Sequence, residues 1–326
     1  MQNVTATMNG TQPQNCESSS YHTAAVKIGQ AFGYCLFLVI SLVGNALIAI
    51  IIHKIKSMRT TTNYFILNTA MSDLLLPILV LPSFLTEIYG GFWFFRGEEG
   101  LVVCKVVFFL QYVSCLVSIE SLVLIAVDRF GAVVYPLRPP LFSSKLCLFS
   151  ILATWVAAVS LCSPNFFGYK AVQYAGEFQS CQLVWKQSFL ADNYLHGLPF
   201  VLVAISFSII AILYCIVLFK LKSQKTPGEQ SVNVVKQREK RQKSVLRMTV
   251  AIVTGFVLCW GPATIFVLLN VFVWHKTPGL SCVVTTYWYI LLAKFMASAN
   301  CAINPCICFA FSEKYRQGLK RLLRRQ

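Results

Sequence analysis

Seven long apolar stretches, separated by polar segments, dominate the pattern of the chain. A helix needs about 20 apolar residues to cross roughly 30 Å of hydrocarbon. Each stretch is predicted to be a helix, because an open sheet would leave backbone hydrogen bonds unsatisfied in lipid. The sequence therefore predicts an all-α membrane protein, a bundle of seven transmembrane helices. The predicted spans are residues 28–52, 64–89, 101–134, 146–167, 189–219, 245–274 and 283–310.

The composition also indicates a membrane protein. Of the 326 residues, 56% are hydrophobic and 12% are charged, whereas about a quarter of the residues of a soluble domain are charged. These values exclude a soluble domain, an intrinsically disordered chain, a collagen-like fibre and a small disulfide scaffold. The net charge of +16 is explained by basic loops at a membrane surface, so it requires no nucleic acid partner.

The basic residues predict the orientation of the bundle. They follow the first, third and fifth apolar stretches, and nine of them lie in residues 220–247. Cytoplasmic loops collect lysine and arginine. We therefore expect a multi-pass protein of the plasma membrane with an extracellular N-terminus and a cytoplasmic C-terminus.

Three regions are expected along the chain: an extracellular segment at 1–26, the bundle at 27–310 and a cytoplasmic helix at 311–326. Asn3 and Asn9 begin triplets that would be glycosylated on the outer side. The first 26 residues lack an apolar signal core, so the first span is expected to act as its own uncleaved insertion signal. No internal repeat or pair of broken helices is visible, which disfavours a transporter or channel.

Two loops are longer than the others. The outer one is predicted to form a hairpin, residues 170–174 and 178–184 around Gly176, that lies over the bundle. The inner one, residues 220–247, is strongly basic. It is expected to continue the fifth and sixth helices on either side of a disordered middle at residues 226–228.

Four of the 13 cysteines fall on the predicted outer side. Cys104 opens the third span and Cys181 lies in the outer hairpin, and an oxidising exterior would let them form a disulfide. Cys16 and Cys282 then remain, and they form either a second disulfide or two free thiols.

The tail after the seventh span has apolar side chains at helical spacing. Its basic residues, Lys320, Arg321, Arg324 and Arg325, fall on the opposite face from Phe311, Tyr315, Leu319 and Leu322. This pattern predicts an amphipathic helix that lies along the inner leaflet.

Several polar residues lie deep in the apolar stretches, where a charge costs about 3 kcal/mol on insertion scales. Asp73 lies about 13 Å inside the second span. Ser118, Asn300, Asn304 and Asn45 fall at similar depths in other spans. Such oxygens suit a sodium ion, and the alternative is a protonated Asp73 in a structural hydrogen-bond network.

Asp128 and Arg129 lie at the inner end of the third span, where the arginine must find a partner that it could exchange when helices move. Pro262 and Pro305 each remove a backbone hydrogen bond inside a span. The sixth and seventh helices are therefore each expected to contain a hinge.

Together these features resemble the rhodopsin-like family of G-protein-coupled receptors, in order and over essentially the whole chain. The residues that carry the resemblance are Gly44 and Asn45; Leu67, Asn68 and Asp73; Cys104; Asp128 and Arg129; Trp155; Pro199; Cys259, Trp260, Gly261 and Pro262; and Asn304 and Pro305.

The resemblance implies roles for these residues. An extracellular ligand shifts an equilibrium of the bundle, the sixth helix swings outward, and Arg129 then contacts a heterotrimeric G protein. Trp260 relays the shift from beneath the ligand, with Phe256 one turn further in. Asp73, Ser118, Asn300 and Asn304 hold sodium in the resting state.

Two departures from the family pattern are visible. The family usually has tyrosine at the end of the helix seven motif, where this chain has Cys308, and eight residues beyond the helix five proline, where it has Phe207. In active family members these two hydroxyls typically meet through water near the arginine. The departures favour weakened signalling and leave a decoy receptor as an alternative.

The ligand is predicted from the outer halves of the helices. Amine receptors of the family have an aspartate where this chain has Gln111, and retinal proteins have a lysine where it has Ser298. Residues 58–65 and 111–114 look like the branch that includes neuropeptide Y, neuropeptide FF, tachykinin and orexin receptors. A neuropeptide is therefore expected, with a lipid or small metabolite as the alternative.

The expected ligand is a peptide with a basic residue near an amidated end. Gln111 would bind the amide, and Glu87 or Asp192 would hold the cation. The full set of expected ligand contacts is Glu87, Gln111, Asp192, Trp260, Asn270 and Lys294.

No metal cluster, activated nucleophile or phosphate-binding glycine loop is apparent in the sequence, so an enzyme is not expected. The expected partners are the peptide, a heterotrimeric G protein, the lipid bilayer and arrestin through the inner loop. Sodium is the one expected small ion, and no other cofactor is expected.

Overall fold

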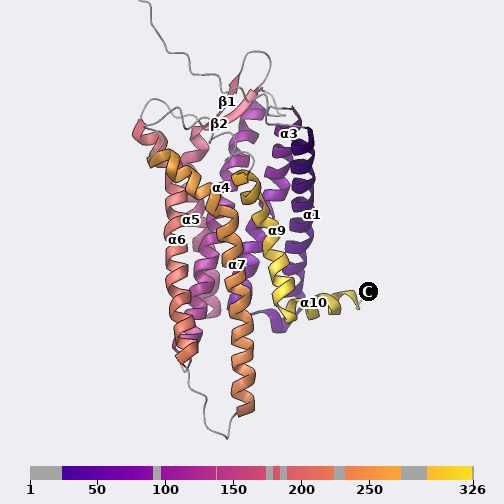
Figure 1. The fold of residues 1–326 in the computed structure, drawn as a ribbon, viewed down its shortest axis with the longest axis vertical. Coiled ribbons are helices and arrows are strands. Elements are labelled where there is room, and N and C mark those ends of the chain that lie inside the picture. The colour runs from indigo at the N-terminus through magenta and orange to yellow at the C-terminus, as the bar shows by residue number, and fades with distance from the viewer. Residues whose placement is uncertain are drawn as a thin grey trace, which may run out of the picture.

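The computed structural model describes residues 24–90, 97–136, 138–173, 179–183, 189–223, 232–272 and 292–324. Long helices run side by side along the long axis of the molecule (Figure 1). They are α1 (Ala24–Lys54), α2 (Thr61–Asp73), α3 (Leu81–Gly90), α4 (Gly97–Val134), α5 (Ser144–Gly168), α6 (Phe189–Ser223), α7 (Val232–Phe272) and α9 (Lys294–Phe311). Shorter elements are η2 (Lys56–Met58), η3 (Leu76–Val80), β1 (Tyr169–Gln173), β2 (Gln179–Leu183) and α10 (Glu313–Leu323).

The all-α membrane fold is confirmed. Six helices of the described chain are long and apolar enough to cross a membrane, and α9 with α10 gives a seventh candidate. Residues 273–291, which include the predicted start of the seventh span, lie outside the described part. The extensions of helices five and six are present in α6 and α7, whereas the loop between them lies outside the described residues.

The surface of the bundle is apolar and its interior holds the polar residues. Phe32, Leu148 and Phe219 are 71%, 69% and 73% exposed. Asp73 and Ser118 are 0% exposed. This arrangement suits lipid, because apolar side chains facing hydrocarbon carry no penalty and polar groups must find partners inside.

The second span is interrupted, which the apolar pattern did not predict. A π-helical turn, η3, separates α2 from α3, and Pro77 lies at its start. Proline has no N–H, so the carbonyl four residues earlier, that of Asp73, loses its helical partner. The hydroxyl of Ser41 on α1 donates to this carbonyl at 3.3 Å, so the carbonyl regains a hydrogen-bond partner.

Close approach of α1 to α9 depends on Gly44. A Cβ at this position would lie 2.5 Å from the Cβ of Pro305. Since real side chains do not approach so closely, glycine permits the contact between the two helices. The residue thus positions the helix that carries Asn304 and Pro305.

The outer hairpin is confirmed as an antiparallel pair, with Ala171 opposite Cys181. It lies at the end of the bundle opposite α10 (Figure 1). The predicted turn around Gly176 is outside the described residues.

The tail helix is also confirmed, and α10 leaves α9 at an angle of 92°. Tyr315 is 1% exposed, and Leu319 and Leu322 pack partly against the core. Phe311 differs from the predicted apolar face, because it ends α9 and is 50% exposed.

Candidate functional site

Asp73 lies in a buried polar cluster, here called the midplane cluster, of Ser72, Asp73, Ser118 and Asn304. The amide nitrogen of Asn304 donates to Asp73 Oδ2 at 2.7 Å, and the Ser118 hydroxyl donates to Oδ1 at 3.1 Å. The hydroxyls of Ser72 and Ser118 are 2.9 Å apart. The cluster therefore joins α2, α4 and α9 through side chains alone.

Three amide oxygens next to these helices have no hydrogen-bond partner within the described chain. They are the Oδ1 atoms of Asn45, Asn300 and Asn304. Asn45 uses its nitrogen, which donates to the backbone oxygens of Ser41 and Cys301, both at 3.0 Å. Buried acceptors without donors carry a cost. Like the Asp73 carboxylate and the Ser118 hydroxyl, these amide oxygens are hard ligands of the kind that suits sodium.

The structure therefore brings together three of the four residues predicted to hold sodium. Asp73, Ser118 and Asn304 are in direct contact. Asn300 is buried at 2% exposure but makes no hydrogen bond to them through its side-chain oxygen.

A second cluster, here called the inner cluster, consists of Thr61, Thr62, Asp128 and Arg129. The guanidinium of Arg129 forms an ion pair with the Asp128 carboxylate. The hydroxyl of Thr62 donates to Asp128 Oδ2 at 2.6 Å and accepts from Arg129 Nη2 at 2.6 Å. Thr61 donates to the other oxygen, Oδ1, at 3.0 Å.

The inner cluster confirms that the arginine finds a partner inside the protein. Although neighbouring residues do not share a helical face, the long arginine side chain turns back to its own neighbour. Thr62 of α2 then fixes both groups. The Nε atom of Arg129 remains buried without a partner in the described chain.

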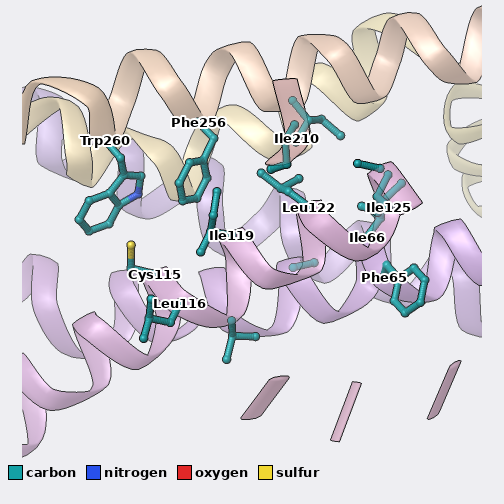
Figure 2. Close-up of a cluster of buried hydrophobic side chains, with 14 of the residues drawn as sticks. Phe65, Ile66, Cys115, Leu116, Ile119, Leu122, Ile125, Ile210, Phe256 and Trp260 are labelled. Carbon is teal, nitrogen blue, oxygen red and sulfur yellow. The ribbon is translucent and has the colours of Figure 1, made fainter. Parts of the chain in front are cut away.

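Buried apolar side chains, here called the apolar layer, lie along α4 between the two clusters, and Figure 2 shows a group of them. Ser118 and Asp128 are ten residues apart on α4, which corresponds to about 15 Å along the helix. Buried aliphatic side chains fill this interval, namely Ile66, Ile119, Leu122, Ile125 and Ile210. Ser121 also lies in this interval and bonds to Val117 and Asn68, but no hydrogen bond joins the two clusters among the described residues.

Trp260 and Phe256 form the outer boundary of this layer. Their rings stack with centroids 6.2 Å apart, and Phe207 meets Phe256 edge-on at 5.7 Å. Both side chains point from α7 toward Cys115 and Ile119 of α4 (Figure 2). Pro262 lies inside α7, and the ribbon of α7 bends in its outer part (Figure 1), as the predicted hinge requires.

Helix five has a buried tyrosine at another position than the one where the family usually has it. Phe207 packs against Phe256, whereas Tyr214, about two turns further along α6, is close enough to Arg129 for an electrostatic interaction. The Tyr214 hydroxyl is buried beside Thr249 without a hydrogen bond of standard geometry in the described chain. The chain therefore lacks the family tyrosine at position 207, as the sequence indicated, and has a different buried tyrosine further along the same helix.

The cysteine at the end of the helix seven motif has a neighbour that supplies a hydroxyl. Cys308 is 0% exposed and lies near Tyr315 of α10. The Tyr315 hydroxyl donates to Asn63 Oδ1 at 3.3 Å, and Asn63 Nδ2 donates to the Met58 carbonyl at 2.7 Å. Burial raises the pKa of Tyr315 well above its usual value, so the hydroxyl keeps the proton that it donates.

The other motif residues link the helices away from these clusters. The indole nitrogen of Trp155 donates to Asn68 Oδ1 at 2.8 Å. The Asn68 amide donates to the hydroxyls of Ser121 and Thr154, at 2.9 and 3.1 Å. The residues therefore join α2, α4 and α5.

Only part of the predicted ligand site can be placed. Gln111 is partly buried on α4, and Lys294 lies 4.1 Å from the ring centroid of Phe84 at the start of α9. Trp260 is 5% exposed, and its indole nitrogen has no partner in the described chain. The side chains of Glu87, Asp192 and Asn270 lie outside the described residues.

Cys104 is disulfide-bonded, which agrees with a bridge at the outer end of α4. Its predicted partner Cys181 lies on β2, and that side chain is outside the described residues. Cys16, Cys282, Asn3 and Asn9 are outside them too.

Several functional residues were missed in the sequence. The midplane cluster has hydrogen bonds from three serines, since Ser41 and Ser114 donate to its backbone carbonyls and Ser72 bonds to Ser118. The inner cluster includes Thr61 and Thr62, which donate to Asp128. Pro77 was the available signal for Ser41, because a proline inside a span frees a carbonyl. No comparable signal singles out Thr62.

Several receptors from other organisms are similar in sequence to nearly the whole of this chain. Neuropeptide FF receptor 2 of Mus musculus is 29% identical, and the match covers 88% of this chain and 70% of the relative. Neuropeptide FF receptor 1 of Homo sapiens is 29% identical, and the match covers 96% of this chain and 75% of the relative. The RYamide receptor of Drosophila melanogaster is 26% identical, and the match covers 90% of this chain and 62% of that receptor.

The family is shown by a match that spans most of the bundle. Residues 44–307 match the family described as 7 transmembrane receptor (rhodopsin family). Its members are multi-pass membrane receptors and not enzymes. The chain therefore belongs to the rhodopsin-like, or class A, family of G-protein-coupled receptors.

Proposed function

We propose that the protein is a plasma-membrane receptor for an extracellular neuropeptide and that it activates a heterotrimeric G protein. The observation that carries the peptide assignment is the similarity to receptors named for neuropeptide FF and RYamide over 88% to 96% of this chain. Gln111 at the position of the amine-receptor aspartate supports it. A lipid or small metabolite remains the alternative ligand class.

Arg129 is the proposed contact to the G protein. In the resting arrangement its charge is satisfied by Asp128 and by Thr62, so it is not free for a partner. When helix six, which is α7 here, moves outward, the arginine can exchange these contacts for acceptors of the G protein. Tyr214 is the nearby hydroxyl that we expect to stabilise the released arginine.

The signal passes through the apolar layer by repacking. Trp260 stacks on Phe256, and Phe256 contacts Phe207 of α6. Close-packed interiors respond to a displaced ring by switching between discrete arrangements. Pro262 supplies the hinge in α7 at which its outer part can turn relative to its inner part.

Sodium is proposed to stabilise the resting state through the midplane cluster. Asp73 and Ser118 would bind the ion, and the partnerless amide oxygens of Asn300 and Asn304 would complete its shell. The ion would hold α2, α4 and α9 together. A ligand that prefers the resting arrangement shifts the population toward it.

The outer contacts of the peptide are proposed from sequence. Gln111 would hydrogen-bond the amidated end and Glu87 or Asp192 would hold its basic residue, with Asn270, Lys294 and Trp260 as further contacts. The N-terminal segment would be extracellular and glycosylated at Asn3 and Asn9. Cys104 would pair with Cys181, with Cys16 and Cys282 as a second pair.

Arrestin is proposed to bind mainly through the inner loop. The tail beyond α9 contains Ser312 and no threonine, so it offers few sites for phosphorylation. The hydroxyl residues of the inner loop are Ser223, Thr226, Ser231 and Ser244. Weak internalisation is expected for this reason.

The test is a screen of amidated peptides, each with a basic residue near the amide, on cells that carry the receptor and a panel of G-protein sensors. We expect at least one peptide to activate a sensor in these cells and not in cells without the receptor. A panel of lipids and small metabolites is tested beside it. Activation by that panel alone would replace the peptide assignment, and solute flux without any sensor response would contradict a receptor.

The peptide contacts are tested with the active peptide itself. Replacing its basic residue by norleucine should lower affinity on the intact receptor and much less on Glu87→Gln or Asp192→Asn, because the cation then has no carboxylate to lose. An equal loss on all three receptors would mean that neither carboxylate binds the charge.

A further inference from the structure

Tyr315 of α10 is buried, although the helix that carries it turns away from the bundle axis (Figure 1). Its neighbours Lys314 and Arg316 are exposed, whereas Tyr315 itself is 1% exposed. Its ring meets that of Phe309 edge-on, with centroids 6.1 Å apart. Its hydroxyl donates to Asn63 Oδ1 at 3.3 Å, which is long for a hydrogen bond between two oxygens. One side chain thus joins α10 to the beginning of α2.

Asn63 connects this contact to the turn that starts α2. Its backbone N–H donates to the hydroxyl of Thr60, the N-cap of the helix, at 3.4 Å. Its side-chain nitrogen donates to the Met58 carbonyl at 2.7 Å. Within the described chain, Tyr315 is the one donor to its side-chain oxygen. Loss of the tyrosine hydroxyl would therefore leave a buried acceptor unsatisfied and free this side of the turn.

The two residues before Asn63 belong to the inner cluster. Thr62 donates to Asp128 at 2.6 Å and accepts from Arg129 at 2.6 Å. Thr61 donates to the same carboxylate at 3.0 Å. All three residues lie in the first turn of α2, and a helical turn moves largely as a unit because its backbone dihedrals are fixed together. Since hydrogen bonds weaken when their distance and angle change, a shift of this turn would loosen the contact between Thr62 and the arginine.

Two other contacts of α10 reach different helices. Gly318 packs against α1, where a Cβ on the glycine would lie 2.8 Å from Ile51 Cγ2. Arg316 donates to two carbonyls near the end of α9, at 3.1 and 2.5 Å. Of these three contacts, the one through Tyr315 reaches the turn that holds the inner cluster. The structure thus provides a way to separate the docking of α10 in general from its bond to α2.

We propose that Tyr315 is a positioning residue through which α10 restrains Arg129 in the resting receptor. Its bond to Asn63 holds the start of α2 in the place where Thr62 binds the arginine. When this bond is lost, the turn relaxes and Arg129 is released more easily. The neighbouring Cys308 of α9 cannot act in its place, because a thiol is a weak donor. This inference rests on the proposed function, in which the released arginine binds the G protein, and it adds α10 to the elements that control the release.

The first experiment compares Tyr315→Phe with the unchanged full-length receptor at matched surface expression. The substitution removes one hydroxyl and keeps the buried ring. Activation of G-protein sensors without ligand should rise about three-fold, because a long neutral hydrogen bond contributes at the low end of the usual range. The matched control is Arg316→Ala, which removes a contact of α10 with α9 and none with α2, and it should leave this activity unchanged. No rise in Tyr315→Phe, or an equal rise in both variants, would overturn the proposal.

A second comparison determines whether the tyrosine acts through Thr62. Tyr315→Phe is combined with Thr62→Val, in which the hydroxyl that binds Arg129 is already absent. We expect the double variant to signal without ligand as strongly as Thr62→Val alone, because residues that act through one contact do not have additive effects. A further three-fold rise in the double variant would mean that Tyr315 acts by another route, and the proposed coupling would be wrong.

A measurement without G protein separates this inference from the proposed function. Cys147 of α5 is 2% exposed and close enough to Asp128 for an electrostatic interaction, so its alkylation requires local opening beside the inner cluster. The rate of its reaction with a water-soluble maleimide is followed by peptide mass spectrometry on the purified receptor in nanodiscs. This rate should rise about three-fold in Tyr315→Phe and stay unchanged in Arg316→Ala. A raised rate in a receptor that activates no sensor would contradict the proposed function and support the role of Tyr315, whereas an unchanged rate would overturn that role.

Discussion

The midplane cluster and the inner cluster are both buried, and both contain an aspartate, but their unsatisfied atoms differ. Around the midplane cluster the atoms without partners are the acceptor oxygens of Asn45, Asn300 and Asn304. In the inner cluster both oxygens of Asp128 are used, and the atom without a partner is a donor, Arg129 Nε. Spare acceptors suit a cation, and a spare donor suits an acceptor from a partner. This difference supports the proposal that an ion binds at the midplane cluster and a protein partner at the inner cluster.

The connections of the two clusters differ as well. The midplane cluster joins three helices by side chains and a fourth, α1, through Ser41. Among the described residues, the hydrogen bonds of the inner cluster join α2 and α4 alone. We therefore expect the midplane cluster to restrain the whole bundle and the inner cluster to release a single side chain.

Arg129→Ala should abolish agonist-driven G-protein activation, because it removes the guanidinium group that is proposed to bind the G protein. Surface expression and ligand binding should remain near normal. The measurement is sensor activation at matched surface expression. Arg138→Ala is the control, since Arg138 stacks on Tyr135 at 5.0 Å outside the cluster. Retained signalling in Arg129→Ala would contradict the proposed contact.

Asp73→Asn should remove the effect of sodium on agonist binding, because the neutral amide cannot replace the charge that attracts the ion. In the unchanged receptor, sodium should lower agonist affinity by about ten-fold, within the usual range of coupling between two sites. Agonist competition in sodium and in N-methylglucamine buffers measures this. Ser114→Ala, which removes only a hydrogen bond to the Ser72 carbonyl, should keep the sodium effect. Sodium sensitivity in Asp73→Asn would mean that the cluster is purely structural.

Thr62→Val should raise signalling without ligand by several-fold. It removes the hydroxyl that holds both Asp128 and Arg129, at a cost of about 1 to 2 kcal/mol to the resting state. Thr61→Val is the matched variant, because Thr61 makes a single, longer contact to Asp128, and its effect should be smaller. Basal sensor activity measures both. The reverse order would mean that Thr62 does not restrain the arginine.

Tyr214→Phe should lower agonist-driven signalling by a few-fold, whereas Phe207→Tyr should not raise it. Tyr214 supplies the hydroxyl near Arg129, and a hydroxyl at position 207 would face the ring of Phe256. Concentration-response curves at equal expression compare the pair. A gain from Phe207→Tyr, with no loss from Tyr214→Phe, would mean that position 207, and not Tyr214, is where a hydroxyl supports signalling.

The elements with a repeating pattern could be predicted from the sequence. The spans follow from apolar length, the hairpin from β-forming residues around Gly176, and α10 from apolar residues at helical spacing. Asp73, Ser118 and Asn304 could also be grouped, because polar residues at one depth in a bundle have few other partners.

The remainder depended on how the helices pack. Thr62 lies in a run of three threonines, and only the contact of α2 with α4 distinguishes it. Counting from Pro199 identified Phe207 as a departure from the family pattern but gave no reason to single out Tyr214. The structure instead places Tyr214 by the contact of α6 with α4 and α7. Pro77 was a signal that the second span is interrupted. That Ser41 bonds to the freed Asp73 carbonyl could not be predicted, because it depends on how α1 packs against this span.

We expect an extracellular ligand to move α7 outward and thereby to release Arg129 from Asp128 and Thr62. Spin labels at Ser244→Cys on α7 and Arg138→Cys beyond the inner end of α4, with the exposed cysteines Cys35, Cys215 and Cys306 replaced by serine, would report the distance between the two positions. We predict that an activating peptide adds a population with a distance several ångströms longer and that sodium reduces it. An unchanged distance distribution in a receptor that activates its G protein would contradict the account.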